Sequence, residues 1–325
     1  MRLGYKLIAE AFDPKEIVRQ GVLAEEAGFD FVEVSDHYHP WLPETNHSGF
    51  AFAMLSNLAA RTERIELATG VTCPSFRYHP AIVAQAAATL SILSDGRFTL
   101  GVGSGERLNE HVVGDAWPNA TTRQRRFREA LEIIRLLWQG GYQSYDGRYF
   151  QLDDARVFDL PDALPVIAVA AGGEQAAELA AELGDGLFAT DPDPELVETY
   201  RRAGGVGPRY TEVSLAYGPD EDAAAAHAHE IFRFGLLGWK VMSELPNPIN
   251  FDAATALVTT DHIKAEFGCG PDVAAHVAAA QPFVDAGFDH LTLVNAGPDV
   301  DGFFTHFRDD LAGALRELTP SDGAV

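Results

Sequence analysis

The segment RIELATGVTCPSFRYHPAIVAQAAATL, residues 64–90, holds one complete unit of a strand, a loop and a helix. Residues 64–70 are predicted to form a strand because apolar and polar side chains alternate along them. From Pro80 onward the apolar residues recur with helical spacing, and proline is favoured at the first position of a helix. Before and after this segment, the spacing of apolar residues switches repeatedly between a period of two and a period of 3.6. This pattern indicates a parallel sheet with helical crossovers.

Eight strands are predicted in this way, with helical patterns between them. They are residues 2–8, 30–35, 64–70, 97–102, 165–171, 185–190, 211–217 and 290–295. Eight such units fit a (β/α)8 TIM barrel, which typically needs about 250 residues. A doubly wound sheet is the alternative, but it does not ordinarily use eight units. We therefore expect one α/β barrel domain over residues 1–325, with insertions at its C-terminal mouth.

The insertions are expected at about residues 140–160 and 222–262. In the first, Asp146-Gly147 lies between aromatic β-formers, which predicts a hairpin over residues 142–152. In the second, a helix over residues 223–236 precedes the segment 238–254, which is too irregular for a regular element. We expect that segment to cover the substrate.

The charge of the chain excludes several kinds of partner. The sequence has 48 acidic and 24 basic residues, a formal net charge of -24, which repels nucleic acid and anionic membranes. The lysines are confined to positions 6, 15, 240 and 264, and such an acid-rich, lysine-poor composition suits high salt, where repulsion is screened. We therefore predict a halophilic protein.

Cysteine usage and the absence of targeting patterns predict a cytoplasmic protein. Cys73 and Cys269 can form neither a disulfide framework nor a structural zinc site, so both are expected to be buried thiols. The sequence has no run of about 18 apolar residues that would span a membrane, and the N-terminus has no signal-peptide pattern.

Polar residues gather directly after the predicted strands, which is where a barrel places its active site. Asp36, His37, His39 and Trp41 follow the second strand. Similar stretches follow the third, fourth and fifth strands, at residues 69–80, 101–111 and 170–176.

Three functions compete for these residues: metal-dependent hydrolysis, ligand binding without catalysis, and redox chemistry with a planar cofactor. His37 and His39 would place two imidazoles on one side of an extended segment, but the fifth strand ends in Ala171-Gly172-Gly173 and offers no further histidine, so no metal is expected. His39 also has a structural or surface interpretation. The glycines of GVGSGE, residues 101–106, lack the G-x-G-x-x-G spacing of a dinucleotide fingerprint.

Four segments together resemble one known family. They are VSDHYHPW (34–41), TCPSFRYHPAIVAQAAATL (72–90), LGVGSGERLNE (100–110) and AVAAGGEQAAELAAELGDG (168–186). In this order they are similar to the luciferase-like superfamily, in its branch that uses the deazaflavin coenzyme F420, and most similar to the F420-dependent glucose-6-phosphate dehydrogenases. Residues 190–285 match poorly. The resemblance implies a (β/α)8 barrel, usually a homodimer, with coenzyme F420 at the C-terminal mouth.

The resemblance also implies roles for matching residues. His37 corresponds to the proposed general base, Trp41 to an aromatic side chain at the reaction centre, and Glu106 to a carboxylate near the cofactor ring. The implied cofactor contacts are Asp36, Gly70, Val71, Ser104, Asn109, Gly172 and Gly173. A non-prolyl cis peptide bond would fall between Gly70 and Val71.

Elementary chemistry asks for the same residue types. A histidine has an ordinary pKa of about 6.5, so His37 suits a base that takes the proton of a hydroxyl as hydride leaves its carbon. A protonated Glu106 would donate a hydrogen bond to a reduced cofactor. Trp41 would exclude water, and as a purely core residue its replacement would harm folding more than turnover.

The substrate is predicted less directly. We expect oxidation of the anomeric carbon of a sugar or sugar 6-phosphate to a lactone, with Lys240 and Lys264 near the positions where the family binds phosphate. Asp191 and Asp193 would oppose a phosphate dianion. An F420-dependent alcohol dehydrogenase on a non-sugar substrate, an FMN-dependent luciferase-like monooxygenase, and a barrel that binds cofactor or sugar without turnover remain alternatives.

Overall fold

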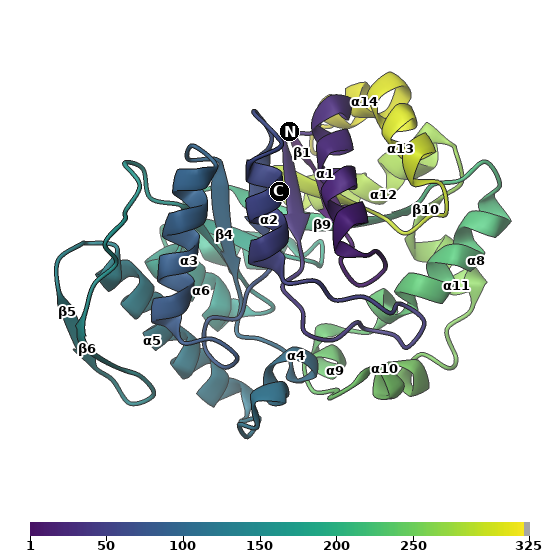
Figure 1. Cartoon of the computed structure of the whole chain (residues 1–325). Coiled ribbons are helices and arrows are strands. Elements are labelled where there is room, and N and C mark those ends of the chain that lie inside the picture. The colour runs from purple at the N-terminus through teal and green to yellow at the C-terminus, as the bar shows by residue number, and fades with distance from the viewer. Residues whose placement is uncertain (322–325) are drawn as a thin grey trace.

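The computed structural model of the chain describes residues 1–321, in which eight parallel strands close into a barrel (Figure 1). The strands are β1 (Arg2–Leu7), β2 (Phe31–Val34), β3 (Glu66–Thr69), β4 (Phe98–Val102), β7 (Val166–Ala170), β8 (Gly186–Ala189), β9 (Arg209–Ala216) and β11 (His290–Asn295). They pair in the order β9, β11, β1, β2, β3, β4, β7, β8, and the pairing of β8 with β9 closes the ring. The predicted (β/α)8 barrel is therefore confirmed, strand for strand.

Helices surround the barrel and run back along its outside (Figure 1). They are α1 (Pro14–Ala27), α2 (Ala51–Ala59), α3 (Pro80–Leu93), α5 (Ala120–Leu137), α6 (Glu174–Leu183), α7 (Pro194–Arg202), α8 (Glu221–Phe232), α12 (Val273–Asp285), α13 (Val300–His306) and α14 (Ala312–Arg316). The helix start in the segment 64–90 follows the sequence signal, since Pro80 is the first residue of α3 and the His79 side chain accepts a hydrogen bond from the Ala81 amide.

The main core lies between the strands and the helices. Alternate residues of β1, among them Leu3, Tyr5 and Leu7, are fully or almost fully buried in it. Inside the barrel, Phe31, Phe188 and Tyr210 form a smaller apolar cluster. Charged side chains also lie inside the barrel, and Lys6 and Glu33 are both buried.

Two excursions interrupt the repeat. The hairpin predicted over residues 142–152 is present as β5 (Gln143–Asp146) and β6 (Gln151–Ala155), which pair antiparallel and project at the left of Figure 1. The second excursion, between β9 and β11, starts with α8 and the 3-10 helix η2 (Arg233–Leu236), then continues through α9 (Trp239–Met242), α10 (Pro248–Ala254), α11 (Thr260–Glu266) and the short strand β10 (Gly268–Cys269).

The expectation that residues 238–254 contain no regular element is wrong, because α9 and α10 lie within them. The missed signal is local: Pro248 is the first residue of α10, and the Asn247 side chain caps the helix by accepting a hydrogen bond from the Asn250 amide. Both cysteines are buried and free, as expected. Within residues 1–321, none of the helices combines the length and the apolar character needed to cross a bilayer.

Candidate active site

The C-terminal ends of the strands open onto a mouth that α4 (Arg107–Glu110), α9 and α10 border, at the bottom of Figure 1. The loops after β1, β2, β3 and β4 supply most of its polar side chains. These loops are close together because neighbouring strands run parallel and in register.

His37 lies between two carboxylates in this mouth. Its Nδ1 contacts Glu10 Oε1, and its Nε2 is 3.4 Å from Glu106 Oε1. The His37 side chain is only 9% exposed. Burial alone would lower the pKa of His37, but the negative charge and hydrogen bonding of Glu10, with a further contribution from Glu106, raise that pKa above its ordinary value.

Glu10 was not identified from the sequence. It follows β1 in the segment Ile8-Ala9-Glu10, so the search for polar residues after each strand would have found it had it been applied to the first strand. Burial would raise the pKa of Glu10, yet the nearby His37 and Lys6 lower it below the ordinary range. Glu10 is therefore the ionised partner that orients the His37 ring.

Asn109 joins the loop after β2 to Glu106. Its Oδ1 accepts hydrogen bonds from the backbone amides of Tyr38 (2.7 Å) and His39 (2.8 Å), and its Nδ2 donates to Glu106 Oε1 at 2.6 Å. The His39 ring donates from Nδ1 to the Leu108 carbonyl at 3.0 Å, because a carbonyl can only accept. His39 thus holds the loop in place, which supports its structural interpretation.

Asp36 is buried and its carboxylate is fully engaged. Thr72 donates to Oδ2 at 2.9 Å, Tyr78 donates to Oδ1 at 3.0 Å, and the Arg77 guanidinium lies 3.1 Å from Oδ1. Arg77 also donates to the Asp36 carbonyl. The three partners come from the loop after β3, so Asp36 locks the ends of β2 and β3 together.

Trp41 forms an apolar wall between His37 and the second excursion. Its ring meets His37 edge to face with centroids 4.9 Å apart, stacks on Phe234 at 4.9 Å, and meets Phe251 at 5.0 Å. The side chain is buried. Trp41 therefore connects the acid–base group, which consists of Glu10, His37 and Glu106, to residues that lie about two hundred positions later in the chain.

Backbone takes the place of side chains on the β3 and β4 sides of the mouth. The peptide bond between Gly70 and Val71 is cis, as the resemblance implied. A Cβ at Gly103 would lie 2.9 Å from Val71 Cγ2, so the β4 loop approaches the β3 loop as closely as glycine allows. Ser104, next to Gly103, is half-buried.

Gly172 and Gly173 lie after β7 and are exposed. Gly173 precedes α6, whose first turn receives no hydrogen bond from a capping side chain. Apart from its chain neighbours, no atom lies within 4 Å of a Cβ built on Gly173, so the space beside this backbone is open to a ligand. Trp239 of α9 lies across the gap, 3.4 Å from a Cβ on Gly172.

The two predicted phosphate-binding lysines have different surroundings. Lys240 is exposed on α9, near the mouth. Lys264 on α11 pairs with Asp222 at the start of α8. Asp193 caps α7 by accepting hydrogen bonds from the amides of Glu195 and Leu196, which gives that acidic residue a structural role.

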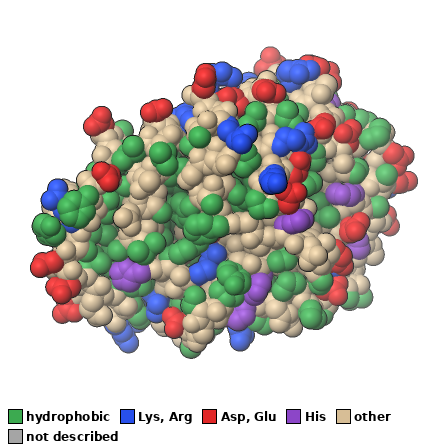
Figure 2. Space-filling view, in the orientation of Figure 1, with side chains coloured by type: hydrophobic (Ala, Val, Ile, Leu, Met, Phe, Trp, Pro, Cys, Tyr) green, Lys and Arg blue, Asp and Glu red, His purple; other side chains and the backbone are tan. Residues whose placement is uncertain are grey.

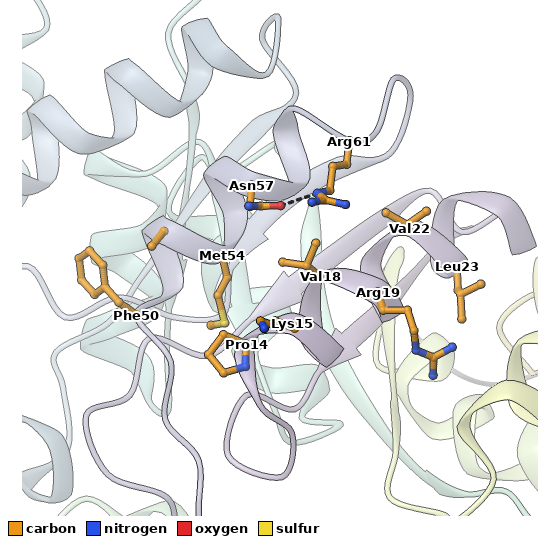
Figure 3. Close-up of a pocket in the computed structure, with 11 residues that line it drawn as sticks. Pro14, Lys15, Val18, Arg19, Val22, Leu23, Phe50, Met54, Asn57 and Arg61 are labelled. Atoms are coloured by element: carbon orange, nitrogen blue, oxygen red, sulfur yellow. Dashed lines mark hydrogen bonds between the residues drawn. The ribbon is translucent and has the colours of Figure 1, made fainter.

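A hollow lies on the outside of the barrel, between α1 and α2 (Figure 3). Its lining is mainly apolar, with Val18, Val22 and Met54 between Pro14 and Arg61. The acid–base group lies elsewhere, at the ends of the strands, so the mouth and not this outer groove is the candidate active site.

The fold and the mouth together define a (β/α)8-barrel enzyme, and comparison with known proteins identifies its family. The family model described as luciferase-like monooxygenase matches residues 1–290. The chain belongs to this luciferase-like family.

Two relatives are F420-dependent glucose-6-phosphate dehydrogenases. The protein from Microbacterium testaceum (strain StLB037) is 36% identical over 330 residues, which cover 98% of each chain. The protein from Mycobacterium avium (strain 104) is 35% identical over 333 residues, which cover 98% of this chain and 99% of the relative.

A solved structure is similar over nearly the same length. An F420-dependent secondary alcohol dehydrogenase in complex with an F420-acetone adduct superimposes with a TM-score of 0.90 at 30% identity, and the match covers 97% of this chain and 99% of that one. The coenzyme F420 dependent tetrahydromethanopterin reductase from Methanopyrus kandleri shares the fold, with a TM-score of 0.78 at 22% identity.

Proposed function

We propose that this chain is an F420-dependent dehydrogenase that oxidises the anomeric carbon of a sugar or sugar 6-phosphate to a lactone. One observation carries the chemistry: His37 is held between Glu10 and Glu106 at the barrel mouth, beneath the Trp41 ring. This arrangement gives a base with a carboxylate behind it, which is what removal of a hydroxyl proton requires.

The mouth fits the coenzyme by its shape and its donors. The open backbone at Gly172 and Gly173 suits the phosphate of F420, because the N-terminus of a helix favours an anion. Gly70, Val71 and Ser104 would face the deazaflavin. Asp36 and Asn109 are buried and bonded within the chain, so they would act by holding the loops that border the cofactor. When bound there, the deazaflavin supplies a two-electron acceptor for hydride.

The residues around His37 divide the work of proton transfer. We assign the proton of the neutral ring to Nδ1, beside the ionised Glu10, which leaves Nε2 as the base on the side of Glu106. Glu10 then stabilises the imidazolium that forms. Glu106 lies on the Nε2 side, where Asn109 fixes its orientation. Trp41 and Phe234 exclude water from this group.

Sugar phosphate as substrate is supported by the names of the relatives at 35–36% identity. Lys240 on α9 is an exposed cation close to the mouth and would meet the phosphate.

An uncharged secondary alcohol is the second candidate, and a specific observation favours it. Three cations of the described chain are already paired with its own carboxylates: Lys264 with Asp222, Arg77 with Asp36, and Arg233 with Asp252. Cations paired in this way are less available to bind a phosphate. The structural neighbour with a TM-score of 0.90 is an alcohol dehydrogenase.

The test is the visible absorbance of oxidised F420, followed without oxygen in high-salt buffer. Glucose 6-phosphate, glucose and 2-propanol are offered separately. Bleaching with either sugar supports the proposal, and bleaching with 2-propanol alone replaces it with the second candidate. In a separate aerobic assay with reduced FMN, substrate turnover that consumes oxygen, without any reaction of F420, would refute both and indicate a monooxygenase.

A further inference from the structure

A charged cluster inside the barrel takes no part in the proton transfer described above. It consists of Lys6 on β1, Glu33 on β2, Glu212 on β9 and Thr292 on β11, and is called the barrel cluster below. Lys6 Nζ donates to Glu33 Oε1 at 2.7 Å and to Glu212 Oε1 at 2.5 Å, and Thr292 Oγ1 donates to Glu33 Oε2 at 3.1 Å. Lys6 lies opposite Glu33 in the strand register, as Glu212 lies opposite Thr292.

The third partner of the ammonium is a backbone atom. Lys6 Nζ donates to the Gly70 carbonyl at 2.8 Å, so the three N–H groups of the ammonium are all used. Gly70 also touches the cluster through its α-carbon, since a Cβ there would lie 2.0 Å from Glu33 Oε1. The barrel cluster therefore holds the residue at the end of β3 from two directions.

The ammonium keeps its charge in this position. Burial alone would lower the pKa of Lys6, but Glu212 and Glu33 raise that pKa above its ordinary value. Burial raises the pKa of Glu33 to about 7, against the opposing effect of Lys6. The positive charge of Lys6 also helps to lower the pKa of Glu10, so the barrel cluster is electrostatically linked to the acid–base group above it.

The residues that follow Gly70 belong to the mouth. Val71 lies against the β4 loop at Gly103, and Thr72 donates its hydroxyl to Asp36 at 2.9 Å. The orientation of the Gly70 carbonyl fixes the peptide plane that leads into both residues. A donor on that carbonyl thus sets where the β3 side of the mouth lies.

We propose that Lys6 is a positioning residue for the cofactor: by holding the Gly70 carbonyl from inside the barrel, it sets the backbone surface of Gly70 and Val71 against which the deazaflavin binds. The inference rests on the proposed function, which takes these residues as contacts of F420. A barrel cluster that served folding alone would stabilise the chain without a selective effect on F420 binding.

Two variants, each compared with the wild type, separate the two roles. Glu212→Gln keeps the Lys6 ammonium and its bond to Gly70. Lys6→Met/Glu212→Gln removes the donor. One carboxylate remains, so the barrel cluster keeps the formal charge of -1 that the wild-type ammonium and its two carboxylates have together. Lys15→Met, at an exposed position of α1, controls for loss of a lysine.

The readout is the dissociation constant of F420, measured by fluorescence titration without substrate, beside the thermal midpoint of the cofactor-free protein. We expect Lys6→Met/Glu212→Gln to bind F420 about tenfold more weakly than the wild type, which carries the same formal charge, because one charged hydrogen bond is lost. Glu212→Gln, which keeps the donor, should bind F420 nearly as tightly as the wild type. A folded double variant that binds F420 as tightly as the wild type overturns the inference and leaves the proposed function standing. Wild-type protein that does not bind F420 overturns both.

A second variant covers the case in which the methionine variant does not fold. Lys6→Gln/Glu212→Gln retains a polar donor at position 6 on a shorter side chain that cannot span the same distance to Gly70. Weaker F420 binding at an unchanged thermal midpoint supports the positioning role, and unchanged binding refutes it.

Discussion

At the scale of single residues, His37 is expected to decide turnover and not cofactor binding. Its Nε2 lies 3.4 Å from Glu106 Oε1, and its Nδ1 contacts Glu10. Removal of a general base typically costs about 10²- to 10⁴-fold. We therefore expect His37→Gln to lower kcat at least about a hundredfold, with the dissociation constant of F420 nearly unchanged.

The matched control is Tyr38→Phe, one residue away, because Tyr38 is 56% exposed and reaches solvent. It should keep wild-type kcat. A His37→Gln variant with near-normal kcat would show that another group takes the proton.

The pH dependence of turnover should report the carboxylate behind His37. Glu10 raises the pKa of His37, and only the neutral imidazole can accept a proton, so oxidation should rise with pH through that raised pKa. Removing the negative charge in Glu10→Gln lowers the pKa of His37. The acidic limb of the kcat/KM profile should therefore move to lower pH.

Glu106→Gln should move the limb in the same direction but less, since Glu106 contributes less to the shift. The test is the pH profile of kcat/KM for both variants and the wild type, measured across the ordinary histidine pKa of about 6.5. It shows whether Glu10→Gln shifts the acidic limb more than Glu106→Gln does. A limb that stays in place, or moves to higher pH, would mean that His37 is not the titrating group.

At the scale of elements, α10 is held to the mouth by an aromatic side chain and an ion pair. Phe251 is fully buried against Trp41, and Arg233 bridges to Asp252 at 2.7 Å and Glu44 at 3.0 Å. Truncating such a phenylalanine typically costs about 3–5 kcal/mol. Phe251→Ala should therefore loosen the second excursion and lower the free energy of unfolding by about that amount.

Ile249→Ala on the same helix is the control, because Ile249 is 73% exposed. Limited proteolysis gives the local readout, with faster cleavage expected between α9 and α11 in Phe251→Ala only. Equal cleavage of both variants would show that packing on Trp41 does not fasten α10.

The strands and the first half of the site were predictable for a physical reason. Each strand has its own period, and parallel strands bring their last residues together, so Asp36, His37 and Glu106 could be placed from local patterns. Lys6 could not, because a lysine within a strand reads as an edge or surface residue. Its inward direction depends on the register of the closed barrel, which brings Glu212 to it from far along the chain.

The second excursion was predicted less well. Its helices are short, and α9 has only four residues, too few for an amphipathic period to be visible. They are stabilised by contacts such as Phe234 on Trp41, which local sequence does not reveal.

At the scale of the whole molecule, the acidic surface should make stability depend on salt. The formal charge of -24 destabilises the folded state through repulsion. Raising KCl from about 0.1 M to about 1 M shortens the screening length from about 10 Å to about 3 Å. The midpoint of thermal unfolding should therefore rise. The same scans with an uncharged osmolyte separate the screening of charges from the exclusion of solute from the protein surface. A midpoint that does not respond to KCl would argue against a halophilic protein.

The predicted homodimer has a candidate surface on α3. Ile82 and Leu93 are 57% and 55% exposed and lie three turns apart on one face of the helix. Figure 2 shows hydrophobic side chains grouped over the region of α2 and α3. Sedimentation should give a dimer for the wild type and a monomer for Ile82→Asp/Leu93→Asp. Lys15→Asp, on α1, is the control for added charge.

The residues for proton transfer and the residues that wall the mouth come from different parts of the chain. Glu10, His37, Trp41 and Glu106 all come from the first four strand–helix units, whereas the wall that faces them, Phe234 and Phe251, comes from the excursion after β9. Substitutions in the later half can therefore change the shape of the mouth, and so the substrates that fit it, while Glu10, His37 and Glu106 stay the same. For an engineer, residues 233–266 form an exchangeable cassette through which new substrates could be reached without rebuilding the chemistry.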